Sequence, residues 1–359
     1  MRRTILLIFT STFFLLASCS SSTKTLTPAT SQLIFMRTEA YTSLQLVAQV
    51  NLNSPFSPIP VSLLADCTVY HLYPNPVDSS LAIEFDCGGQ PVVELADTRS
   101  GSASPASSRY ADARFLAWSA SGRYLYLKSN PLDAPHVVRV DRLSNAAPKK
   151  LSLPTTVYDL AGLPDGRIVY STTQGLGFGS ETWLADASGV HAERILAEPL
   201  NIVAYLRPSP DGSRIAYIRM PDSQVPFTVG GLWVIPASGG EASFLAEADA
   251  GHGYAPAWSP DGRQIAFVVR ENPDDQNADL SAGALLSNVY QLEVQSDTLT
   301  PVTSFSDAIV EAPVWSPEGS GLFFTVHRNG TIQVWVDDTG TLRPLSAENS
   351  CCAVWVPGR

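Results

Sequence analysis

The sequence predicts an all-β fold, a single β-propeller of four-stranded blades, from three observations. A hairpin phrase recurs along the chain, and its clearest copy reads Trp-Ser-Pro-Asp-Gly-Arg-Gln-Ile-Ala-Phe over residues 258–267. The turn glycines of its five copies follow one another at spacings of 44, 46, 50 and 57 residues, at Gly122, Gly166, Gly212, Gly262 and Gly319. Outside the N-terminal segment, no long amphipathic helical pattern appears. Strands that repeat about every 40 to 50 residues indicate propeller blades.

Each copy of the phrase predicts a β-hairpin. Pro presets φ at the second turn position, Asp can bond its own backbone, and Gly adopts the positive φ that ends the turn. The flanks are β-branched and aromatic, as strands prefer. A second phrase, Gly-Leu-Trp-Val-Ile-Pro-Ala-Ser-Gly-Gly at 231–240, has related versions at 182–189 and 332–340. It predicts a third strand and a Gly-containing turn into a fourth.

Together the two phrases resemble the TolB-like, WD40-like (PD40) propeller repeats. The resemblance extends from about residue 32 to the C-terminus and is strongest over residues 114–340. It implies the fold and says little about activity, because similar repeats occur in the translocation protein TolB and in the propeller domains of prolyl-oligopeptidase-type peptidases. Function therefore has to be argued from individual residues.

The two chain ends predict how the ring closes. Residues 353–359 read as the opening of another repeat, and residues 32–36 and 44–50 supply a second and a third strand. Pairing these segments would remove two open sheet edges. A weaker hairpin at 70–85 raises the expected count to seven blades. Six blades is the alternative, if the weak unit at 69–97 or the split blade is not a true blade.

The N-terminal segment predicts a lipid anchor. Residues 1–18 combine two basic residues with a short apolar stretch, as in a secretory signal peptide. Leu-Ala-Ser-Cys at 16–19 resembles the bacterial lipobox, in which Cys19 is lipidated, and the Ser/Thr-rich residues 19–31 predict a flexible tether. We therefore expect residues 32–359 to form the propeller of a lipoprotein of the cell envelope, facing the periplasm or the cell exterior.

Export implies an oxidising compartment, so the remaining cysteines are disulfide candidates. If Leu72 pairs with Ala82 across the first hairpin, Cys67 lies opposite Cys87. The adjacent Cys351 and Cys352 could bridge each other, bond elsewhere or stay reduced, and four cysteines allow three connectivities.

The sequence shows no signature of a particular chemistry. A net charge of -11 and a pI near 4.9 argue against nucleic acid as a partner. No Gly-x-Ser-x-Gly, His-Glu-x-x-His or phosphate-loop motif is present, and we expect no cofactor and no metal. The acidic pattern at 275–279 begins like a calcium loop but has Leu280 in place of the required glycine. Of the five histidines only His252, in a loop that enters an innermost strand, is expected near the channel.

Loop length gives the most direct indication of a binding face. Three successive connections between second and third strands are long, at about 172–180, 220–230 and 271–286. Long loops in compact domains are commonly functional. Two groups of side chains become candidate ligand contacts: loop residues, and residues four positions before the Trp position of successive repeats, which should ring the channel entrance. They are Phe178, Met220, Phe227 and Glu271 in the loops, and Arg114, Tyr158, Tyr254 and Glu311 around the channel.

These observations favour a binding module for a protein, peptide or glycan over an enzyme. The first alternative is a propeller hydrolase or lyase with a site at the channel mouth, and the second is a structural subunit of an envelope complex. The alternative to ligand binding is a structural role, in which the channel residues pack or hydrogen-bond between blades.

Overall fold

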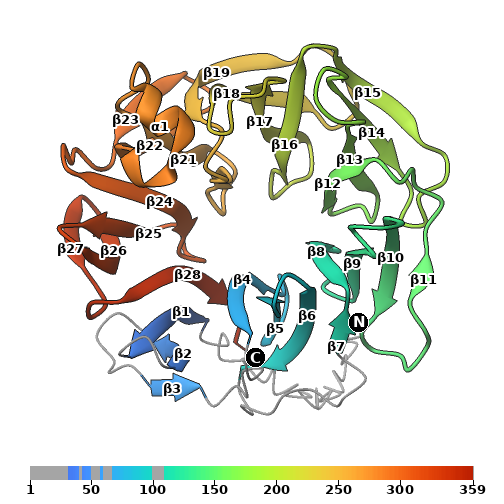
Figure 1. Cartoon of the computed structure of the whole chain (residues 1–359), viewed down its shortest axis with the longest axis horizontal. Coiled ribbons are helices and arrows are strands. Elements are labelled where there is room, and N and C mark those ends of the chain that lie inside the picture. Colours follow the sequence, from blue (N-terminus) through green and yellow to red (C-terminus); the bar gives the residue numbers. More distant parts are fainter. Residues whose placement is uncertain (1–30, 40–42, 50–56, 60–66, 99–108, 359) are drawn as a thin grey trace, which may run out of the picture.

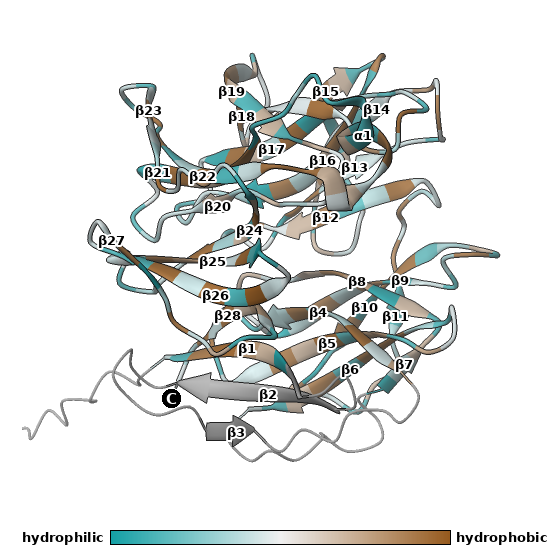
Figure 2. Cartoon of the chain, turned by 60° about the vertical axis from the view of Figure 1, so that its left-hand side comes forward, coloured by the Kyte–Doolittle hydropathy of each residue, from teal (hydrophilic) through white to brown (hydrophobic). Residues whose placement is uncertain are grey.

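The computed structural model describes residues 31–39, 43–49, 57–59, 67–98 and 109–358, which form four-stranded antiparallel sheets arranged around a central channel (Figure 1). Apolar residues lie along the strands, and hydrophilic residues gather in the connections (Figure 2). Cys19 and the rest of the expected leader and tether lie outside the described residues. Within the described part of the chain, no helix is long and apolar enough to cross a membrane.

Six sheets are built from consecutive strands, each running from an innermost strand at the channel to an outermost one. The first three are β4 (Thr68–Pro74), β5 (Ser80–Asp86), β6 (Pro91–Asp97), β7 (Arg109–Ala111); β8 (Ala113–Trp118), β9 (Tyr124–Ser129), β10 (His136–Asp141), β11 (Lys149–Lys150); and β12 (Val157–Gly162), β13 (Ile168–Thr172), β14 (Ser180–Ala185), β15 (Glu193–Glu198). The next three are β16 (Asn201–Pro208), β17 (Arg214–Pro221), β18 (Val229–Pro236), β19 (Ser243–Asp249); β20 (Ala257–Trp258), β21 (Gln264–Arg270), β22 (Ser287–Glu293), β23 (Thr298–Pro301); and β24 (Ala308–Trp315), β25 (Gly321–Arg328), β26 (Thr331–Asp338), β27 (Thr341–Pro344).

The expectation of seven complete blades closed by the chain ends is corrected to six complete blades. Six sheets are each built from four consecutive strands, and these are the complete blades. A further sheet is composite: β28 (Ser350–Val356) pairs with β1 (Gln32–Glu39), followed by β2 (Ser43–Gln49) and β3 (Ser57–Ile59). The connections of its outer strands, at 40–42, 50–56 and 60–66, lie outside the described residues. The weak unit at 69–97 does form a true blade.

The repeated turns form as their sequence predicts, with one addition. Gly262 has φ +69° and its N–H donates to the Ser259 carbonyl at 2.9 Å. The Ser259 hydroxyl donates to Asp261 at 2.6 Å and accepts from the Gln264 N–H at 2.9 Å, so the serine also closes the hairpin. A left-handed φ is readily adopted only by residues such as glycine, which explains why glycine recurs at this position.

Neighbouring blades are joined by apolar clusters and by tryptophan. Leu184 and Val169 of one blade pack with Ile215 and Tyr217 of the next, and all four are buried. Three Trp indoles donate to a main-chain carbonyl of the preceding blade, at 2.8–3.1 Å: Trp118 to Tyr73, Trp258 to Arg207 and Trp315 to Ala257. The repeated Trp is thus a packing residue and a hydrogen-bond donor between blades.

The first hairpin carries the expected disulfide, with a corrected register. Cys67 and Cys87 are bonded, and Thr68 lies opposite Asp86 as anticipated. A bulge between Val69 and His71 then shifts the pairing by one residue, so that Leu72 faces Ile83 and not Ala82. A bulge places two residues opposite one, and this changes the register beyond it.

Candidate functional site

The three long loops form one continuous surface, which we call the loop wall and define as residues 173–179, 222–228 and 271–286. They join second to third strands in three successive blades. The Gly179 N–H donates to the Asp222 carboxylate at 2.7 Å, linking the first loop to the second. The Phe227 N–H donates to the Asp279 carbonyl at 3.1 Å, linking the second to the third. The loop wall is therefore held together across blades.

The third loop has a small fold of its own. It contains α1 (Gln276–Leu280) and the 3-10 helix η2 (Ala282–Ala284), and the Asp275 side chain caps α1 by accepting from the Asn277 N–H. The fully buried Arg270 side chain donates to the Asp279 carboxylate at 2.8 Å and to the Asp275 carbonyl at 2.7 Å. The acidic residues that begin like a calcium loop thus serve as a helix cap and an arginine partner.

The channel mouth, by which we mean the loop-bearing ends of the innermost strands, has one basic sector. Arg114 pairs with the buried Glu84 at 3.1 Å, and its guanidinium remains half exposed. Burial raises the pKa of Glu84 in spite of this partner. Lys128, the register partner of Arg114, donates to the Val157 carbonyl at 2.7 Å, and burial and Arg114 lower its pKa. This sector joins three blades through charged hydrogen bonds.

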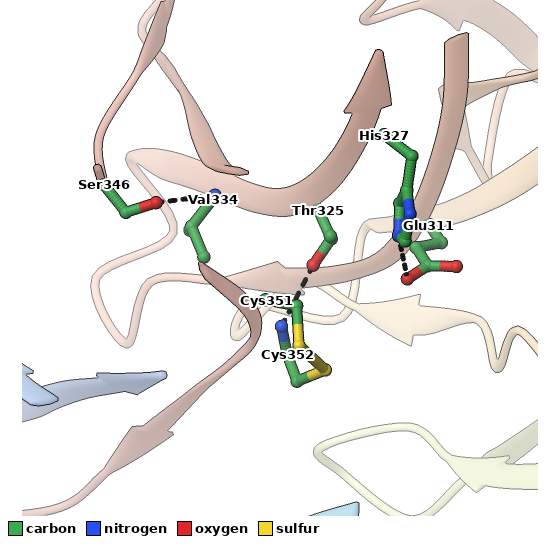
Figure 3. The surroundings of a disulfide bond; sticks show 7 residues. All are labelled: Glu311, Thr325, His327, Val334, Ser346, Cys351 and Cys352. Atoms are coloured by element: carbon green, nitrogen blue, oxygen red, sulfur yellow. Dashed lines mark hydrogen bonds and ion pairs between the residues drawn. A yellow bond between two sulfur atoms is a disulfide. The ribbon is translucent and has the colours of Figure 1, made fainter. Parts of the chain in front are cut away.

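A second sector centres on Glu311, on the innermost strand β24. His327 Nε2 lies 2.8 Å from its Oε1 (Figure 3). Burial by itself would raise the pKa of Glu311, but the hydrogen bond and charge of His327, together with the influence of Tyr254, outweigh burial and lower it. Burial and the Glu311 charge both raise the pKa of Tyr254. Two of the predicted channel residues, Tyr254 and Glu311, thus influence each other's pKa.

His252 connects the channel mouth to the loop wall. Its Nδ1 lies 2.7 Å from the buried Asp249 carboxylate, and its ring stacks on Phe227 at 4.6 Å between centroids and 8° between planes. Tyr254 is also stacked, at 6.2 Å. The His252 side chain is 1% exposed, and its Nε2 has no hydrogen-bond partner. A carboxylate that orients an imidazole is an arrangement used by general bases, but the Nε2 of His252 is buried in this structure.

The remaining predicted residues have different environments. Phe178 is 66% and Tyr158 46% exposed, so both are available to a ligand. Met220 instead packs against the core cluster between two blades. Glu271 accepts from the Tyr290 hydroxyl at 3.1 Å and from Asn288 at 3.2 Å, and so it links its loop to β22.

Sequence reasoning missed the gathering of histidines around Glu311. His71, His252 and His327 come from three separate parts of the chain, yet all three influence or contact this carboxylate. Burial, followed by the Arg114 charge, lowers the pKa of His71. Among the described residues, no group of three or more His, Cys, Asp or Glu side chains is placed to hold a metal ion. In the sequence, the one sign of this group was that His252 lies in a loop that enters an innermost strand.

A cavity of about 380 Å³ lies at the edge of the loop wall, between the third loop and the β25–β26 hairpin. Five apolar side chains and five polar ones line it: Leu285, Leu286, Ala308, Ile309 and Ile332, with Asp307, His327, Arg328, Asn329 and Thr331. It adjoins the Glu311 sector through His327 and offers a concave surface to a ligand.

Comparison with known proteins now identifies the family. The model of the TolB beta propeller domain, PD40, matches residues 159–353, which is more than half of the chain. The chain belongs to the TolB beta-propeller family.

Relatives of this TolB-family chain include a peptidase and a Tol-Pal system protein. Dipeptidyl-peptidase 5 of Porphyromonas gingivalis is 23% identical over 143 residues, 38% of this chain and 20% of that protein. The Tol-Pal system protein TolB of Alcanivorax borkumensis is 41% identical over 76 residues, 21% of this chain and 15% of that protein. A prolyl endopeptidase structure has a TM-score of 0.62 at 8% identity, and the match covers 90% of this chain and 50% of the endopeptidase chain. The chain thus spans a fifth or less of the length of these two curated relatives, and the structural likeness concerns the fold alone.

Proposed function

We propose that this TolB-family propeller is a binding module, and that its loop wall and channel mouth hold a protein, peptide or glycan ligand. The observation that carries the proposal is the hydrogen-bonded continuity of the three loops, extended to the channel by the stack of Phe227 on His252. A surface that is already ordered costs little conformational entropy when a ligand binds.

Exposed aromatic residues supply the expected anchors. Phe178 and Tyr158 belong to the same blade and expose 66% and 46% of their surface. Large, rigid aromatic side chains contribute disproportionately to binding energy. The cavity beside His327 could receive an apolar side chain or a ring from the ligand.

The test is capture of a cross-linked partner by variants of these anchors. Phe178→Ala combined with Tyr158→Ala should reduce capture at least about tenfold. Phe244→Ala is the matched control, because Phe244 is also an exposed aromatic residue, at 52%, but lies on the outermost strand β19. Equal capture by both variants would exclude the loop wall as the binding surface.

We also propose that the protein is held in the cell envelope by lipid on Cys19. The pattern at 16–19 supports the anchor, and the likeness to an envelope-system protein named for Tol-Pal agrees with that location. Replacing Cys19 with Ser should leave the leader uncleaved or release the protein from membranes. An unmodified Cys19 in the native protein, found by mass spectrometry, would refute the anchor.

A second candidate function, catalysis at the channel mouth, is favoured by the Asp249–His252 pair with its unpartnered Nε2. Purified protein would be assayed on chromogenic esters and peptide anilides. Turnover that is lost in His252→Ala and kept in His136→Ala, a change at a residue on β10, would support it. No turnover on either substrate class would count against a hydrolase.

A further inference from the structure

The chain contains a disulfide between two adjacent residues, Cys351 and Cys352, at the start of β28 (Figure 3). In the chain-entropy account, a disulfide stabilises a fold by an amount that rises with the logarithm of the length of the loop that it closes. Cys67–Cys87 closes a loop with a sequence separation of 20, whereas Cys351–Cys352 has a separation of 1. The second bridge therefore restricts the unfolded chain very little, and global stability does not account for it.

The bridge lies at an irregular point of the innermost strand. The pairing of β28 with β1 shifts between Ile34 and Met36, and Cys352 has φ +64°. Equivalent points in β16 and β24 show the same feature, with Tyr205 at φ +57° and Ala312 at φ +52°. Non-glycine residues rarely adopt this conformation, and when they do they are commonly at functional sites.

The same point adjoins the Glu311 sector. The Cys352 N–H donates to Thr325 Oγ1 at 3.0 Å, and Thr325 is the strand partner of Glu311. His327, two residues further along β25, bonds Glu311 at 2.8 Å (Figure 3). Both cysteines are half-buried, so neither is sealed in the core.

We propose that Cys351–Cys352 is a thiol-exchange site at the channel mouth, with a dithiol as its reaction partner. A thiolate of the dithiol attacks one sulfur, the Cys351–Cys352 bond breaks, and the other cysteine leaves as a thiolate that takes up a proton. The second thiol of the partner, as its thiolate, then attacks the mixed disulfide. The products are two protein thiols and the oxidised, cyclic disulfide of the partner, so two electrons pass to the protein. This inference does not depend on which ligand the loop wall binds.

Dithiothreitol is the probe for the first test. The full chain would be treated under native conditions, quenched with N-ethylmaleimide and mapped by mass spectrometry. Cys351–Cys352 should be reduced at least about tenfold faster than Cys67–Cys87, the internal control. Reduction of both bridges together, or of Cys351–Cys352 only on unfolding, would overturn the proposal.

Two further measurements separate exchange from a structural role. The double variant Cys351→Ser/Cys352→Ser should keep the thermal midpoint of the parent, and a large fall would show that the bridge is a structural staple. The imidazole NMR signals of His327 should differ between the oxidised and reduced parent protein, while those of His136 should not. Unchanged His327 signals would show that the bridge does not communicate with the channel mouth and would also refute the proposal.

Discussion

Arg270 offers the sharpest test of how the loop wall is built. Its side chain is fully buried and ends inside the third loop, where it donates to the Asn272 carbonyl at 3.0 Å, the Asp275 carbonyl at 2.7 Å and the Asp279 carboxylate at 2.8 Å. Arg270→Ala would leave these acceptors without their donor. Strands β21 and β22 would remain paired, so the loss should be confined to residues 271–286.

The expected magnitude follows from the kind of interaction lost. Removing the Arg270 side chain breaks three hydrogen bonds from a buried charged group, each worth about 1.5–3 kcal/mol, while the partly exposed Asp279 carboxylate can be rehydrated, so a total of about 3–5 kcal/mol is expected. Applied to local opening of the third loop, this corresponds to roughly a hundred- to several-thousand-fold faster hydrogen exchange. Most of the cost should not reach global unfolding, because the β21–β22 ladder lies outside the affected loop.

Native-state hydrogen exchange followed by mass spectrometry would measure this change. The Ala278 N–H, which donates to the Asp275 carbonyl at 3.0 Å, is a suitable reporter. Arg263→Ala is the matched control, since Arg263 is 77% exposed and lies 3.8 Å from Asp261. Exchange in 271–286 that is the same in both variants, or a global loss of stability equal to the local one, would refute the argument.

Three further predictions concern stability. Replacing Cys67 and Cys87 with Ser should cost about 3 kcal/mol in urea denaturation, because their bridge has a sequence separation of 20; a cost under about 1 kcal/mol would contradict the loop-closure account. Trp258→Phe should lower the free energy of unfolding by about 1 kcal/mol more than Trp355→Phe, because the Trp258 indole donates a hydrogen bond between blades whereas the buried Trp355 Nε1 has no partner. Equal losses in urea denaturation would show that the Trp258 bond does not stabilise the blade junction. Folding lowers the pKa of Glu311, so the ionised carboxylate stabilises the fold fully above its unfolded pKa, near 4.5, and this stabilisation is lost as the pH falls through the folded pKa. Glu311→Gln should therefore reduce the loss of stability on acidification, and an unchanged loss would contradict the argument.

The blade architecture could be predicted from sequence because its determinants are local. The residues that make each turn lie within five positions of one another, and the turn at Gly262 needs no distant partner. The strand count was harder at the chain ends, where β28 pairs with β1 across the whole length of the chain. The register of the first hairpin was wrong beyond Val69, because a bulge leaves no clear trace in the alternation of residues.

The candidate site could be predicted only in outline. Loop length located the loop wall, but the bonds that join its loops connect residues 43 or more positions apart and have no pattern in the sequence. Tyr254 and Glu311 were both expected at the channel, whereas the approach of His71 and His327 to Glu311 was not. Met220 was expected in the wall but packs in the core, because a loop estimated from sequence began one residue before the end of β17.

Only some blades use a tryptophan to bond to the preceding blade. Gly162 and Pro208 occupy the positions that Trp258 and Trp315 occupy in other repeats, so two successive blade junctions lack the indole hydrogen bond to the preceding blade. Gly162 instead approaches the main chain of the preceding blade so closely that an added methyl group would lie 2.8 Å from the Trp118 carbonyl oxygen. One of these two junctions, between β12–β15 and β16–β19, lies beneath the loop wall. That junction is held instead by the buried cluster of Leu184, Val169, Ile215 and Tyr217 and by the bond from the Leu206 N–H to Asp159, so the blades beneath the loop wall are joined without the tryptophan that marks other repeats.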